Sequence, residues 1–227
     1  IVKLVYPEGY VACFIDDCTN AVVWAHYGDG HKGVCLKFKT TEKNGCPAID
    51  LRRITGEKRS ESVYGYQTFS FRKINYSNQF PSIGFFRSMG RLPMPQLSRQ
   101  WYADQGGNGS QCANWMNGDT VEDWRKEHWD NYDRGFFIKL KDWEHEREQR
   151  LLLSSALDTY KMPEAREFTY KFEDLEAIIF GMRTRVEDKV KIKEIIDSKC
   201  KENNRNNFEY YQAGYSPSLG KMVINKI

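Results

Sequence analysis

The sequence has no long hydrophobic run, since no stretch approaches the roughly eighteen consecutive apolar residues that a membrane-spanning helix needs. It also shows no charged start followed by an apolar run and a small-residue cleavage site, the pattern of an export signal. We therefore expect a cytoplasmic protein with no membrane partner.

The sequence also lacks a large excess of either charge, because its 34 lysines and arginines nearly balance its 31 aspartates and glutamates and leave a net charge of +3. This near balance lacks the strong positive field of nucleic-acid-binding domains, although it leaves room for a local basic patch. The six cysteines include no C-x-x-C pair, so we expect reduced thiols in a reducing compartment. A P-loop, a nucleophile elbow and a G-x-G-x-x-G after a strand are all missing, which excludes the common sites that they mark.

Hydrophobic residues make up 40% of the 227 residues and aromatic residues 14%, which is enough for a packed core. We predict a single α+β domain over residues 1–227, with a mixed or antiparallel central sheet and short flanking helices. Within the polar residues 40–59, loops are expected at 43–45 and 56–59, and residues 77–118 are expected to form an irregular insertion or lid. Strands are expected at 2–6, 10–15, 34–39, 69–76, 135–140, 146–153, 172–181, 208–213 and 221–224, and helices at 21–27, 120–132 and 187–200.

The first segment that could carry chemistry is WAHYGDGHKG, residues 24–33. A short helix would place Trp24 and Tyr27 on one face by their spacing of three, beside glycines that allow close approach of another group. Such a platform suits a base or a nicotinamide ring, with His26, His31 or Lys32 for a phosphate or a ribose. The alternative is structural: a tryptophan anchor in the core and a capped turn.

The second segment is KLKDWEHEREQR, residues 139–150, which contains Trp143 and is followed by three leucines. If residues 146–153 form a strand, Glu146, Glu148 and Arg150 share one face, because side chains alternate along a strand. Charged groups in a sheet are costly unless they pair, so we expect Arg150 to hold at least one carboxylate. A helix here would instead make the segment an ordinary solvated run of charges.

Two glutamates on one strand face suit chemistry at an anomeric carbon. Glu148 would stabilise the positive charge of an oxocarbenium-like transition state, while Glu146 would position or deprotonate the acceptor. No metal is needed for this reaction. The same glutamates could alternatively bind Mg²⁺ in a nuclease, although the aspartate-rich partner set of such a site is not evident.

Both segments resemble signatures of the bacterial family catalogued as domain of unknown function 2971. The likeness begins with VACF at residues 11–14 and WAHYGDGHKGVCLKF at 24–38, continues with KINY at 73–76 and KDWEHEREQR at 141–150, and ends with IIFG at 178–181. The motifs keep their order and cover most of the chain, from about residue 10 to 225.

The resemblance implies a bacterial, cytoplasmic effector, a toxin or an antiphage defence protein. The motif layout is also similar to the ADP-ribosyltransferase fold, which implies NAD as co-substrate, Glu148 as the catalytic glutamate and Glu146 as its acceptor-side partner. It further implies a substrate pocket formed by Trp24, His26, Tyr27, His31, Lys32, Trp143 and Arg150. Expected partners are a nucleic-acid or protein acceptor and a defence-system or antitoxin protein. A noncatalytic sensor or partner-binding module is the remaining hypothesis, in which both motifs only hold the fold.

Overall fold

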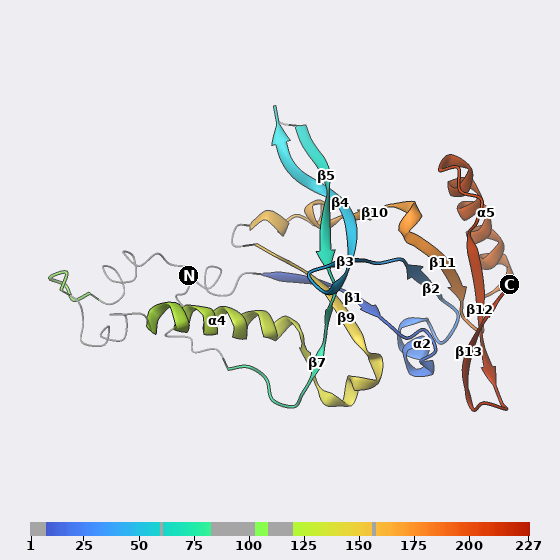
Figure 1. The fold of residues 1–227 in the computed structure, drawn as a ribbon, viewed down its shortest axis with the longest axis horizontal. Coiled ribbons are helices and arrows are strands. Elements are labelled where there is room, and N and C mark those ends of the chain that lie inside the picture. The colour runs from blue at the N-terminus through green and yellow to red at the C-terminus, as the bar shows by residue number, and fades with distance from the viewer. Residues whose placement is uncertain (1–7, 60, 83–102, 109–119, 156–157) are drawn as a thin grey trace. The chain divides into compact units, whose positions relative to one another are not determined.

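A computed structural model describes residues 8–59, 61–82, 103–108, 120–155 and 158–227 (Figure 1). The expected strand at residues 2–6 and most of the expected insertion at 77–118 lie outside these ranges. The described chain divides into two compact units. The first comprises the described parts of Ile1–Ala12, Ile74–Lys141 and Leu152–Met162, and the second comprises those of Cys13–Lys73, Asp142–Leu151 and Pro163–Ile227.

The protein is α+β, with several antiparallel or mixed sheets and few helices. The strands are β1 (Gly9–Ile15), β2 (Val34–Phe38), β3 (Thr41–Lys43), β4 (Cys46–Lys58), β5 (Glu61–Ser70), β6 (Arg72–Lys73), β7 (Asn75–Tyr76), β8 (Ile138–Lys139), β9 (Glu148–Ser154), β10 (Thr169–Tyr170), β11 (Leu175–Phe180), β12 (Glu209–Ser216) and β13 (Lys221–Lys226). The α-helices are α2 (Ala21–Tyr27), α4 (Thr120–Phe136) and α5 (Val186–Glu202). Short 3-10 helices are η4 (Lys141–Glu146), η5 (Asp158–Tyr160), η6 (Pro163–Arg166) and η7 (Phe172–Asp174). None of the described helices is long and apolar enough to cross a membrane.

Instead of one central sheet, the described strands form separate sheets. Their orders are β1-β9-β6, β13-β12-β11-β2, β10-β4-β3 with β5 paired to β4, and β7-β8. In the first unit, α4 leads into the short β7-β8 pair, and the buried residues in or next to these strands are Ile74, Phe137 and Ile138.

The second unit contains the main core. Strand β11 is buried along nearly its whole length because it is central in its sheet, parallel to β12 and antiparallel to β2. One side packs Ile179 against Trp24 of α2, and the other packs Phe180 against Ile196 of α5. A third cluster, formed by Ile49, Phe71 and Leu151, joins β4 and β9.

The predicted loop at residues 43–45 coincides with a turn at Asn44 and Gly45, whereas the predicted loop at 56–59 is wrong because β4 continues to Lys58. Strands β3 and β4 form a tight hairpin that pairs Lys43 with Cys46, and the two connecting residues, Asn44 and Gly45, both have positive φ. Asn-Gly is the preferred sequence for this turn. Strand β4 then continues into a long antiparallel pair with β5. The expected strand at 135–140 is also shorter than predicted, because α4 extends to Phe136 and leaves only β8.

Candidate functional site

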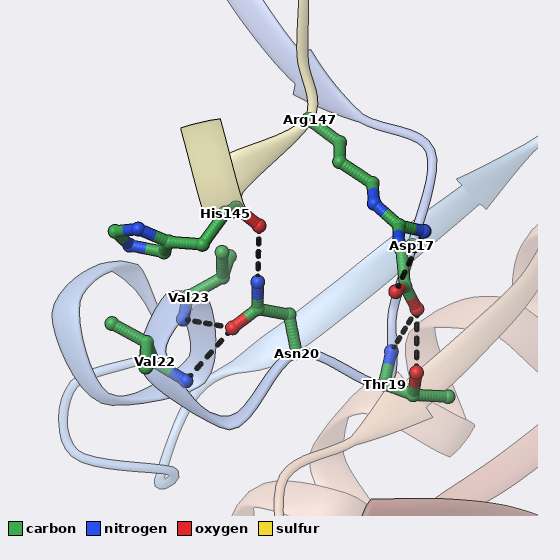
Figure 2. Close-up of polar contacts among 7 residues, drawn as sticks. All are labelled: Asp17, Thr19, Asn20, Val22, Val23, His145 and Arg147. Carbon is green, nitrogen blue, oxygen red and sulfur yellow. Dashed lines mark hydrogen bonds and ion pairs between the residues drawn. The ribbon is translucent and has the colours of Figure 1, made fainter. Parts of the chain in front are cut away.

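The two motifs meet where α2 contacts η4 within the second unit (Figure 2). The Asn20 side-chain amide donates a hydrogen bond to the backbone carbonyl of His145. The Tyr27 hydroxyl donates to Glu146 Oε1 at 2.9 Å, and the His26 and Trp143 rings lie edge to face with centroids 6.1 Å apart. We call this set of contacts the junction.

Helix α2 begins where it does because Asn20 is its N-cap. The Asn20 side-chain oxygen accepts hydrogen bonds from the backbone N–H groups of Val22 and Val23, at 3.0 and 3.2 Å. The same side chain therefore caps one segment with its oxygen and binds the other with its nitrogen, and Figure 2 shows both contacts.

A second link joins the loop before α2 to the residue after η4. Arg147 Nη1 lies 3.4 Å from a carboxylate oxygen of Asp17 (Figure 2). Hydrogen bonds from the Thr19 hydroxyl and backbone N–H hold the pKa of Asp17 below its ordinary value, and the charge of Arg147 adds to this effect. The loop thus presents a fixed negative charge to Arg147.

The expected strand at 146–153 starts two residues late, and this corrects the predicted position of Glu146. Arg147 has a φ of 48°, in the left-handed region, so the chain turns between η4 and β9. Glu146 ends the 3-10 helix and is buried, with 3% of its surface exposed. It is therefore held by Tyr27, not by the strand face that carries Glu148 and Arg150.

Glu148 and Arg150 do form the predicted pair on one face of β9. Arg150 Nε donates to Glu148 Oε1 at 2.6 Å, and Nη2 donates to Oε2 at 3.3 Å. Only 5% of the Glu148 side chain and 16% of the Arg150 side chain are exposed. A close, two-point pair with so little solvent is the arrangement that stabilises a buried carboxylate.

Neighbouring groups reinforce the charge state of this pair. Burial opposes the charge of Arg150, but the hydrogen bond and the charge of Glu148 outweigh it, so the Arg150 pKa is raised overall. On β1, burial raises the pKa of the Cys13 thiol, and Glu148 raises it further against the opposing effect of Arg150. On the other side, β6 places Arg72 directly opposite Arg150 in the antiparallel register. One face of the sheet thus gathers Cys13, Glu148, Arg150 and Arg72.

The remaining predicted residues lie elsewhere in the second unit. Trp24 is a core anchor, 5% exposed, and its indole Nε1 donates to the Cys18 carbonyl at 2.7 Å. His31 lies in the turn after α2 with a φ of 72°, and its carbonyl accepts a hydrogen bond from the Arg183 backbone N–H. Lys32 is exposed and lies 4.0 Å from Asp29. For Trp24 the structural alternative raised from the sequence therefore holds, whereas His26, Tyr27 and Trp143 take part in the junction.

A cavity of about 310 Å³ lies against the opposite face of β9. Alternation along the strand separates Gln149, which lines it, from Glu148 and Arg150. Its volume is near the lower end for ligand pockets. Other lining residues include Phe14, Asp16, Lys37, Phe38 and Phe71.

Sequence reasoning missed Asn20, Asp17 and Cys13 as parts of the site. The cap preference of Asn20 was a usable signal for the start of α2, but nothing in the sequence indicates its contact with a carbonyl 125 residues away. Among the described residues, no group of three or more histidine, cysteine, aspartate or glutamate side chains is arranged to hold a metal ion.

No protein-family model, curated protein or solved structure matches this chain. The likeness of its motifs to the bacterial family named above therefore stays an interpretation of the sequence.

Proposed function

We propose that this chain is a metal-independent, NAD-dependent transferase of the ADP-ribosyltransferase type, with a fold related to that class, acting in the bacterial cytoplasm as a toxin or an antiphage effector. The observation that carries the proposal is Glu148, a buried carboxylate fixed in β9 by Arg150. A carboxylate held in place in a poorly solvated sheet can stabilise developing positive charge without reorganising.

In the proposed reaction, the bond between nicotinamide and the ribose C1′ breaks and neutral nicotinamide leaves with the bonding electrons. The oxocarbenium-like ribose then forms a bond to a nucleophile of a nucleic-acid or protein acceptor, which loses its proton. Glu148 stabilises the ribose cation, and we assign the acceptor's proton to Glu146.

The two hydrogen bonds from Arg150 fix the Glu148 carboxylate in one orientation. Arg72, opposite Arg150 in the register, brings a second guanidinium to this face. Guanidinium groups bind phosphates well, so the face combines a ribose-directed carboxylate with groups suited to a pyrophosphate.

A noncatalytic partner-binding module is the second candidate, and one observation favours it. Both glutamates are buried and already hydrogen-bonded to Tyr27 or Arg150, which is what a purely structural role would require. In that case the junction and the ion pair hold the fold, and binding takes place elsewhere.

The test is incubation of the purified chain with NAD labelled in its adenylate portion and a bacterial lysate, with Mg²⁺ or with EDTA. Transfer of label in EDTA is expected. Glu148→Gln should lower the rate about a hundredfold or more, because it keeps the shape of the side chain and removes its charge. Glu202→Gln, at an exposed pair on α5, is the matched control and should retain the parent rate.

Three other outcomes would contradict the proposal. Normal folding and full activity of Glu148→Gln would remove the catalytic assignment. Cleavage of nucleic acid that requires Mg²⁺ would favour a nuclease instead. Absence of both activities in every lysate would favour the noncatalytic module.

A further inference from the structure

The long β4–β5 pair carries a surface that has no part in the transferase proposal (Figure 1). Its register sets Arg52 opposite Tyr66 and Ile54 opposite Tyr64. Directly paired residues point to the same side, and so do residues two apart on one strand, so all four side chains share one face. Lys171, which follows β10, reaches this face as well, because its ammonium group lies over the Tyr66 ring. We call these five residues the hairpin face.

The tyrosines of the hairpin face are stacked with cations and yet open to solvent. The Arg52 guanidinium carbon lies 4.5 Å from the Tyr64 ring centroid, and Lys171 Nζ lies 4.6 Å from that of Tyr66. Nevertheless Tyr64 is 50% exposed and Tyr66 is 52% exposed. Cation–ring pairs at exposed sites stabilise a fold only weakly, so they do not by themselves account for two large rings that stay half exposed to water.

The charge around these rings is positive. Lys43 donates to the Thr68 carbonyl nearby, and Asp50, an acidic neighbour, is paired with Lys171 at 3.0 Å. Asp174 is a second carboxylate close enough to act on Lys171, so three cations, with Arg52, stand against two carboxylates. Further along the hairpin, Glu57 and Glu61 are balanced by Lys58 and Arg59. The near-neutral total charge of the chain therefore conceals a local cluster of cations around exposed aromatic rings.

We propose that the hairpin face binds single-stranded nucleic acid, with bases stacked on Tyr64 and Tyr66 and phosphates neutralised by Arg52, Lys43 and Lys171. Aromatic rings interleaved with cations are the means by which proteins bind single strands without reading their sequence. The two rings sit two residues apart on β5, roughly 7 Å along the strand. Neighbouring bases must separate to reach both rings, and a single strand allows this whereas a duplex does not.

The test is fluorescence anisotropy of the whole chain with labelled twelve-nucleotide RNA and DNA single strands and a duplex of the same sequence. Single strands of either kind should bind more tightly than the duplex, by about tenfold or more, because only they offer unstacked bases. Tyr64→Ala and Tyr66→Ala should each weaken binding by about tenfold. Tyr64→Phe keeps the aromatic ring and should bind with the affinity of the parent. Tyr215→Ala, at another exposed strand tyrosine, is the control and should bind as the parent does.

Arg52→Ala gives a second measurement that remains informative if a tyrosine variant folds poorly. Loss of one phosphate contact should reduce the slope of log K against log salt by about 0.7. Absence of binding to either single strand at low salt would overturn the proposal. So would unchanged affinity in folded Tyr64→Ala and Tyr66→Ala, or equal affinity for the duplex. None of these results depends on NAD or on Glu148, so the binding proposal and the transferase proposal can fail separately.

Discussion

Replacing Arg150 with methionine tests the ion pair of β9 most directly. Methionine has similar length but no charge, so the variant leaves the Glu148 carboxylate, 5% exposed, without its closest cation. Removal of one partner from a buried pair typically costs about 3–5 kcal/mol. For a chain of this size that corresponds to a fall in melting temperature of roughly 10 °C.

The matched control is Arg185→Met. Arg185 is paired with Asp188 by two similar hydrogen bonds, but its side chain is 72% exposed. Exposed pairs of this kind contribute little to the free energy of unfolding, because water and salt screen them. Urea unfolding followed by circular dichroism should therefore show a midpoint shift several times larger for Arg150→Met than for Arg185→Met.

A double variant separates the unpaired charge from lost packing. Adding Glu148→Gln to Arg150→Met should recover part of the lost stability, since the buried carboxylate that lacked a partner is then also gone. Equal midpoint shifts in Arg150→Met and Arg185→Met would refute the buried-pair reasoning. A double variant as unstable as the sum of the two single variants would also refute it.

Two further predictions concern the junction and the thiols. Asn20→Ala should destabilise the fold by about 1–2 kcal/mol, because it removes both the helix cap and the contact to His145. Asn20→Asp should keep the cap and lose only that contact, so its urea midpoint should lie between those of the parent and of Asn20→Ala. A midpoint of Asn20→Asp equal to the parent's would show that the contact to His145 contributes nothing. Burial raises the pKa of Cys35 to about 11, and because only the thiolate reacts, its alkylation by iodoacetamide should accelerate about tenfold per pH unit from pH 7 to 10. Mass spectrometry of the modified peptide measures this rate, and a plateau below pH 9 would contradict the burial.

Local signals predicted the elements of the main core well. Helix α2 was expected at residues 21–27 and has those ends, because a cap residue precedes it and Gly28 follows it. The apolar run of β11 was likewise sufficient, since this strand is stabilised by burial that its own sequence displays. Helix α5 was also expected, but Val190 and Ile195 of its apolar pattern are exposed, and Ile196 is its one buried residue. The resemblance also implied one pocket with residues of both segments, and His26 of α2 does contact Trp143 of η4.

Elements stabilised by pairing instead of burial were not predictable in the same way. Strand β4 has little apolar alternation beyond Ile49 and Leu51, and its pairing with β5 stabilises the rest of the strand. The predicted position of Glu146 on the strand face was wrong for a different reason. The sequence does not indicate that an arginine will adopt the left-handed backbone conformation, so the start of β9 was predicted before Arg147. The pairing of Glu148 with Arg150 survived this error because it depends only on their spacing of two.

The left-handed backbone of Arg147 also determines which sequence changes this connection can tolerate. Side chains alternate along β9, so one added or deleted residue between Glu146 and Glu148 would reverse the whole strand, turning Arg150 toward the phenylalanines around Leu151. Substitution of Arg147 by glycine or asparagine keeps the length and suits the observed φ. Divergence here should therefore change the residue and preserve the spacing, because chain length between the two elements decides which face of the strand is charged.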